Sequence, residues 1–129
     1  MPPLPLLALA GLVLFLACAI PAGRSRIKRW QVPALLAAAF FAYSLWPVLT
    51  MGPLGFWPEH VSDPWSVQIW FDLLCAIGVG WALLVPRARA AGMVPWPWLE
   101  LIAATGSIGL LAMLARVLYR EGTATSTTA

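Results

Sequence analysis

Charge is what this sequence has least of. Only 10% of its 129 residues are Asp, Glu, Lys or Arg, and 61% are hydrophobic. An ordinary soluble domain has about 25% charged residues, because a soluble surface needs them. A chain with so few is expected to lie mostly in lipid.

The sequence also has little material for catalysis or metal binding. It contains one histidine, His60, and its two cysteines, Cys18 and Cys75, fall in separate apolar segments. There is no serine–histidine–aspartate set, HExxH motif, glycine-rich phosphate loop or CxxC pair. Loop polarity explains the cluster of Glu59, His60 and Asp63 more simply than a metal ion does. We therefore predict no enzyme activity, no catalytic residue, no metal and no cofactor.

What the chain does have is four apolar segments, each close to the roughly 20 residues that a helix needs to cross a bilayer. They lie at about residues 4–20, 32–51, 67–85 and 99–118, and a polar tail follows at 121–129. Short loops between them favour antiparallel neighbours. The sequence thus predicts an all-α integral membrane protein: one transmembrane domain, residues 1–129, folded as an antiparallel four-helix bundle.

The first apolar segment has a second interpretation, a cleaved secretory signal. Such a signal begins with positive residues, whereas the leader MPPLPLL has none and the basic cluster at 24–29 follows the apolar run. The charge pattern favours a retained first helix.

Positive residues mark two of the three loops. Loop 22–31 has four of them and loop 86–97 has Arg87 and Arg89, whereas loop 52–65 has none. The positive-inside rule then predicts a multi-pass protein with the first and third loops in the cytoplasm and both termini outside. Arg116 and Arg120 violate this orientation. Because the basic residues fall at helix ends rather than on a soluble face, nucleic acid is not an expected partner.

Tryptophan is placed in a similar way. Six of the eight tryptophans lie at or near predicted helix ends: Trp30, Trp46, Trp57, Trp65, Trp96 and Trp98. Indole rings at such positions are typical of the headgroup level of a membrane.

Asp72 is the unusual residue of the third segment, because a carboxylate in hydrocarbon has to be paired or hydrated. A rise of about 1.5 Å per residue from the cytoplasmic loop puts Asp72 at roughly 21 Å and Arg116 at roughly 27 Å. An arginine stem can bend across that difference. We predict an intramembrane Asp72–Arg116 pair near the outer interface. The alternative is a carboxylate that carries a proton or cation, with Gln68 as its neighbour.

Small and polar residues share the faces of the last two segments. Gln68, Asp72 and Cys75 follow helical spacing, and Gly78 and Ala82 form a small pair four residues apart. In the fourth segment, Ser107 suits close packing and interhelical hydrogen bonds. Packing of small faces is the simpler interpretation. The other is a cleft for a quinone, lipid or pigment, with Gln68, Cys75 and Ser107 as its candidate residues.

The second half of the chain resembles a family of small bacterial inner-membrane proteins that have four helices and no assigned function. The resemblance covers about residues 62–121 and rests on Asp72, Arg87, Arg89, Gly92, Met93, Arg120 and Glu121. Pro86 stands where the family often has an acid. The resemblance implies a four-helix protein of a bacterial inner membrane, with a cytoplasmic turn built around Arg87, Arg89 and Gly92. It implies no activity.

These features predict a non-enzymatic accessory or scaffold subunit. It would lie in the lipid bilayer and pack against another membrane protein or against copies of itself. The alternative is a small carrier or a lipophilic-ligand-binding protein that uses a cleft around Asp72. In the first case Asp72 holds helices together, and in the second it contacts what is bound.

Overall fold

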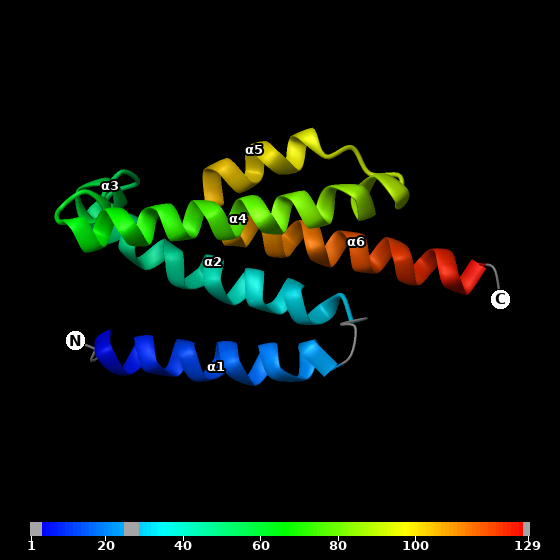
Figure 1. Cartoon of the computed structure of the whole chain (residues 1–129), viewed down its shortest axis with the longest axis horizontal. Coiled ribbons are helices and arrows are strands. Elements are labelled where there is room, and N and C mark those ends of the chain that lie inside the picture. The colour runs from blue at the N-terminus through cyan, green and yellow to red at the C-terminus, as the bar shows by residue number, and fades with distance from the viewer. Residues whose placement is uncertain (1–3, 25–28, 128–129) are drawn as a thin grey trace.

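The computed structural model describes residues 4–24 and 29–127, and within these residues the chain is all-helical (Figure 1). The helices are α1 (Leu4–Arg24), α2 (Gln31–Met51), α3 (Phe56–His60), α4 (Pro64–Ala90), α5 (Trp96–Thr105) and α6 (Ser107–Thr127). The all-α prediction is confirmed. The first three predicted segments correspond to α1, α2 and α4. Residues 25–28 of the basic loop, the side chain of Cys18 and the end of the polar tail lie outside the description.

The predicted fourth helix does not exist as one element, because the chain reverses at Gly106. This residue has φ of +65° and ψ of −129°, a conformation that residues with a Cβ rarely adopt. Its N–H donates to the carbonyl of Ile102, which ends α5, and α6 starts at Ser107 and runs back toward the start of α5 (Figure 1). The prediction of a single helix over 99–118, and with it the four-helix count, is therefore wrong.

The two arms of this α5–α6 hairpin touch through their backbones at Gly109. A Cβ at this buried glycine would lie 2.8 Å from the backbone nitrogen of Ile102 and 2.9 Å from its Cα. Cβ atoms do not approach backbone atoms that closely, so only glycine fits here. The missing side chain lets α6 lie directly against α5.

α6 is the central helix, in contact with α2, α4 and α5. Met113 and Val117 of α6 are fully buried. They belong to a hydrophobic core whose buried members are Leu84, Ala88, Met93, Ile102, Met113 and Val117. The core therefore joins α4, α5 and α6, and α2 covers another side of α6.

α4 and α6 are in contact and run in the same direction, whereas helices in contact in the predicted bundle are expected to be antiparallel. Ile77 lies against Gly106, and farther along Gly80 faces Leu110. The predicted close approach at Gly78 and Ala82 does not occur, since both residues are exposed. This parallel packing follows from the reversal at Gly106. α5 runs antiparallel to α4, and α6 runs antiparallel to α5, so α6 has the same direction as α4.

The helices bury little of their apolar surface. The chain exposes 9555 Å², whereas a soluble monomer of 14.0 kDa exposes about 6,700 Å². α1 contributes strongly, because its described residues do not pack closely against any other described helix. Leucine and phenylalanine side chains along α1 and α2 are exposed, including Leu35 at 72% and Leu49 at 82%.

Two helices, Gln31–Met51 and Pro64–Ala90, are long and apolar enough to span a membrane. A shorter apolar stretch, Leu4–Ala17, lies in α1. A core helix of a soluble protein can have the same length and composition, but it is mostly buried. Here only 11% and 6% of the two apolar windows are buried. Length and composition by themselves are weak support for a membrane location.

The described arginines gather at one end of the molecule, which we call the basic end. Trp30, next to Arg29 at the start of α2, contacts Tyr119, and Arg87 near the end of α4 bonds Glu121. The opposite end holds α3 with Glu59 and His60 (Figure 1). α1 begins at the opposite end and α6 finishes at the basic end. The first and last helices therefore do not start and finish at the same end of the molecule, because the reversal at Gly106 returns the chain to the basic end.

Replacing Gly109 by alanine tests the backbone contact in the hairpin. We expect Gly109→Ala to lower the free energy of unfolding by about 1–3 kcal/mol, the usual cost of forcing atoms into a packed site. The matched control is Gly78→Ala, which has open space around it and should gain roughly 0.5–1 kcal/mol from helix propensity. Thermal unfolding followed by circular dichroism gives both values. Equal midpoints for the two variants would contradict the contact.

Candidate functional site

A Schellman turn ends α4 and sets the geometry of the basic end. The N–H of Met93 donates to the carbonyl of Ala88 at 2.9 Å, and the N–H of Gly92 donates to that of Arg89 at 3.0 Å. Gly92 has φ of +74°, as this motif requires of the residue after the helix. Met93 and Ala88 are buried in the core, which anchors the turn. A turn at Gly92 is thus present, but Arg87 and Arg89, which the sequence places in the loop 86–97, lie in the last turn of α4.

Two arginines, Arg87 of α4 and Arg120 of α6, join this turn to α6. Arg87 donates from Nε to Oε1 of Glu121 at 3.0 Å and from Nη2 to Oε2 at 2.8 Å, a bidentate pair between α4 and α6. Arg120 donates from Nη1 to the carbonyls of Ala91 and Gly92 at 3.3 and 3.4 Å. We call these contacts the clasp. They bring together most residues of the resemblance, although Arg89 is exposed and Asp72 lies elsewhere.

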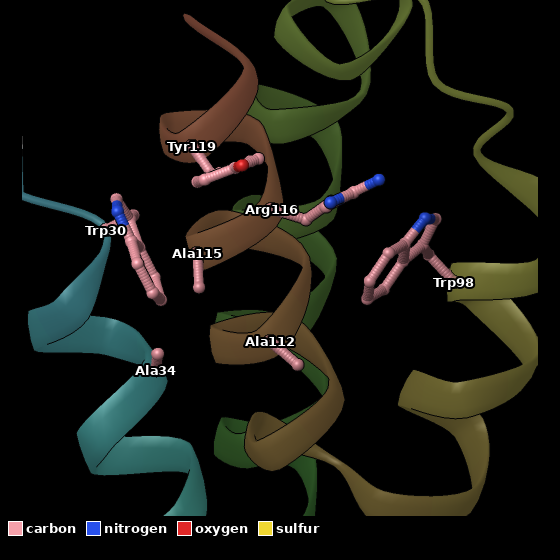
Figure 2. A pocket seen from close by; sticks show the side chains of 7 residues that line it. All are labelled: Trp30, Ala34, Trp98, Ala112, Ala115, Arg116 and Tyr119. Carbon is pink, nitrogen blue, oxygen red and sulfur yellow. The ribbon is translucent and has the colours of Figure 1, made fainter. Parts of the chain in front are cut away.

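A cavity of about 310 Å³, the arginine cavity, opens beside the clasp between α2, α5 and α6. Figure 2 shows its lining: Trp30, Ala34, Trp98, Ala112, Ala115, Arg116 and Tyr119. Arg116 extends from α6 toward Trp98, and Trp30 and Tyr119 lie on the side of α2 (Figure 2). The rings of Trp30 and Tyr119 meet edge to face, with centroids 5.5 Å apart.

Arg116 differs from the arginines of the clasp in its partners. Its guanidinium carbon lies 5.6 Å from the ring centroid of Tyr119, a cation–π distance. Among the residues that the structure describes, it has no hydrogen bond and no ion pair. The arginine cavity therefore contains a charged group whose donors are available.

A second cavity, of about 390 Å³, lies toward the opposite end between α3, α4 and the hairpin. Its mouth is aromatic: the rings of His60 and Trp70 are 5.0 Å apart, and Phe56 stacks on Trp70. His60 Nδ1 lies 2.6 Å from the carbonyl of Phe56, so this nitrogen donates and Nε2 is left as an acceptor when the ring is neutral. Ile102 and Gly106 are among the residues at the hairpin side of this cavity.

The start of α4 is fixed by Asp63. Its Oδ1 accepts from the N–H of Ser66 at 3.0 Å and its Oδ2 from the Ser66 hydroxyl at 2.9 Å, an N-cap arrangement. These two hydrogen bonds, the backbone one first, lower the pKa of the Asp63 carboxyl below its usual value. Asp63 and His60 thus serve local structure, and no group of three potential metal ligands occurs among the described residues.

The predicted pair of Asp72 with Arg116 is not formed. Asp72 precedes Ile77 on α4, and Ile77 lies at the level of Gly106. Asp72 is five residues before this level, toward the opposite end, and Arg116 is ten residues after it, toward the basic end. At about 1.5 Å per residue, the two side chains start roughly 22 Å apart along the bundle. The prediction failed because it assumed one straight fourth helix, and the reversal at Gly106 carries Arg116 to the basic end.

The predicted cleft residues are not brought together either. Gln68, Asp72 and Cys75 are all exposed on the face of α4 that points away from α6, and Cys75 is a free thiol. Ser107 is half-buried at the start of α6. None of these four residues is among those that line the two cavities.

The arginine cavity is not predicted by the sequence. The sequence places Trp30 and Trp98 at helix ends, and Arg116 is assigned there to a pair with Asp72 and to a violation of the charge pattern, not to a cavity. The signal that could have found the site is the arrangement of Ala112, Ala115 and Arg116 on one helix, small residues beside a single charge. No protein-family model, curated protein or solved structure matches the chain. The resemblance to a bacterial membrane family stays a prediction.

A double-mutant cycle tests the clasp. Glu121 has further interactions, so only the combination of Arg87→Gln and Glu121→Gln isolates their pair. The two side chains are 33% and 40% exposed, and we expect a coupling of about 0.5–1 kcal/mol that falls in 1 M salt. Chemical unfolding of the four proteins measures it. The control cycle pairs Arg89→Gln with Glu121→Gln and should show no coupling; equal coupling in both cycles would refute the assigned pair.

Proposed function

We propose that the chain is an integral membrane protein without catalytic activity, which acts as an accessory or scaffold subunit of a membrane assembly. In this arrangement α1, α2 and α4 cross the bilayer. Their 21, 21 and 27 residues correspond to about 31, 31 and 40 Å, enough for a hydrocarbon core of about 30 Å. The α5–α6 hairpin enters from the basic end and returns to it.

The distribution of charge supports a cytoplasmic basic end. Arg87, Arg89, Arg116 and Arg120 all lie on the last turns of α4 or on the half of α6 that returns to this end. By the positive-inside rule, this end faces the cytoplasm. Arg116 and Arg120 then no longer violate the rule. α1 begins outside and α6 ends in the cytoplasm.

The observation that carries the proposed function is the position of Asp72. It is exposed on the outward face of α4, one turn after Gln68, and has no hydrogen bond or ion pair to any residue that the structure describes. A charged residue costs about 2.5–3.5 kcal/mol at the centre of a membrane helix, and a part of that at the level of Asp72, which lies in the first third of α4. A neighbouring protein that supplies a donor would remove this cost.

Neither α1, which does not pack on another described helix, nor α2 is suited to be that neighbour. The stretch Leu4–Ala17 of α1 contains only apolar residues and glycine, so it has no side-chain donor to offer. α2 packs on α6 at a different face of the bundle from the one that Gln68 and Asp72 occupy. The neighbour is therefore another protein segment, from a second copy or from a different membrane protein.

A reporter at the C-terminus tests the orientation. Green fluorescent protein fused after Ala129 should fluoresce, since this reporter folds in the cytoplasm and not after export through the general secretory route. The control moves the same reporter to a position after Gly52, between α2 and α3, where we expect no fluorescence. A dark C-terminal fusion that is present at normal abundance would contradict the hairpin topology.

A cross-linking experiment tests the outward face of α4. Cys75 lies one turn from Asp72, so a photoreactive maleimide on Cys75, in a Cys18→Ser background, should cross-link a neighbouring protein in native membranes. Mass spectrometry of the product then distinguishes a second copy from another protein. Asp72→Leu should reduce the yield about fivefold, the effect of about 1 kcal/mol, and Asp72→Asn should reduce it less.

The control for this experiment moves the probe to an exposed residue of α2. In a variant with Cys18→Ser, Cys75→Ser and Leu49→Cys, the probe is expected to label lipid rather than protein. Equal protein cross-linking from Leu49→Cys and from Cys75 would indicate random encounter. The absence of any protein product from Cys75 would rule out the proposed docking face.

A further inference from the structure

We propose that the arginine cavity is a binding site for one anionic phospholipid, with the phosphate held by Arg116. The inference rests on the proposed membrane insertion, because a lipid can enter the cavity only from a bilayer. It goes beyond a scaffold role, since it assigns a ligand class to a cavity that the scaffold does not need.

Arg116 supplies the donors that a phosphate requires. A guanidinium has five N–H donors in a planar fork that matches two phosphate oxygens. Arg87 and Arg120 direct theirs to Glu121 and to the turn carbonyls, whereas Arg116 only stacks with Tyr119. The contact with the Tyr119 ring uses none of the hydrogen-bonding capacity of the guanidinium.

The walls of the cavity suit the region where headgroup and acyl chain meet. Trp30, Trp98 and Tyr119 each combine an apolar ring with one polar hydrogen, and none of these hydrogens bonds another residue in the described part of the chain. Such side chains are characteristic of the headgroup level. They can donate to phosphate or glycerol oxygens while their rings contact the upper part of an acyl chain.

The floor of the cavity leaves room for that chain. Ala34 of α2 and Ala112 and Ala115 of α6 present methyl groups, so the two helices form a shallow apolar surface below the aromatic rings. Among the described residues that line the cavity none is acidic, and Arg116 is the only charged one. A headgroup with a quaternary ammonium would place a second cation beside Arg116, which favours a lipid with net negative charge.

The depth of the cavity agrees with this ligand. Trp98 lies in the first turn of α5 and Trp30 directly before α2, so the cavity is at the basic end. In the proposed orientation, this level is the cytoplasmic leaflet, where anionic lipids attract basic groups. Arg116 and an anionic headgroup would therefore meet without either leaving its preferred layer.

The test uses the full chain reconstituted in nanodiscs of phosphatidylcholine that contain a small fraction of phosphatidylglycerol. Native mass spectrometry after release counts the lipids that remain bound. We expect retained phosphatidylglycerol in excess of its share of the bilayer. Arg116→Gln should lower that retention about tenfold, and Arg116→Lys should lower it less, because an ammonium keeps the charge but not the fork.

Two controls separate this site from general attraction to charge. Arg89→Gln removes an exposed arginine of the same end outside the cavity and should change retention less than twofold. Ala112→Leu fills the floor and should lower retention while leaving Arg116 in place. Circular dichroism of each variant confirms that its helix content equals that of the unmodified chain, so a loss of retention reports on binding.

Several results would overturn the inference. Equal losses in Arg89→Gln and Arg116→Gln would reduce the effect to surface charge, and equal retention of both lipids would remove the preference for an anion. Displacement of the lipid by millimolar inorganic phosphate would make the free anion the ligand. Failure to incorporate into nanodiscs would instead refute membrane insertion, whereas incorporation without lipid preference would leave the proposed function intact.

Discussion

The backbone contact between α5 and α6 is the constraint on which the rest of the structure depends. Gly106 reverses the chain in a conformation that glycine tolerates, and Gly109 lets the returning helix lie directly on the one before it. Because α6 returns, it can pack parallel to α4 and reach the Schellman turn with Arg120 and Glu121. The clasp and the arginine cavity both exist only because α6 returns past the start of α5 to the end of α4.

Much of the fold could be predicted from apolar length, and the hairpin could not. α1, α2 and α4 correspond to uninterrupted apolar segments, whose composition is sufficient to identify a helix. The reversal depends on one glycine. Gly106 differs locally from Gly78 and Gly80, which stay helical, in its small polar neighbours Thr105 and Ser107, and such residues also occur inside membrane helices. The turn at Gly106 is stabilised by contacts between α5 and α6, which form only once the chain has turned, so the sequence alone predicts a straight helix. The depth of Arg116 in the membrane, which was counted along that straight helix, is therefore different in the structure.

The candidate sites divide in the same way. The turn with Arg87 and Gly92 could be predicted, since a Schellman motif is local and glycine marks it. The arginine cavity assembles residues from three helices, and their meeting depends on the reversal. The same reversal separates Asp72 from Arg116. Arg116 lies at the basic end, and Asp72 is an exposed carboxylate on the outward face of α4.

The hairpin also gives the molecule unequal widths at its two ends. A plane through the basic half cuts α5 and α6 as well as the three long helices, whereas a plane through the opposite half cuts the long helices alone until it meets the short α3 (Figure 1). Inserted as proposed, the protein would occupy more area in the cytoplasmic leaflet than in the outer one. Several copies side by side would then bend the bilayer, because each is wider in one leaflet than in the other. Assembly of the protein would therefore favour a curved bilayer, and a curved bilayer would favour assembly.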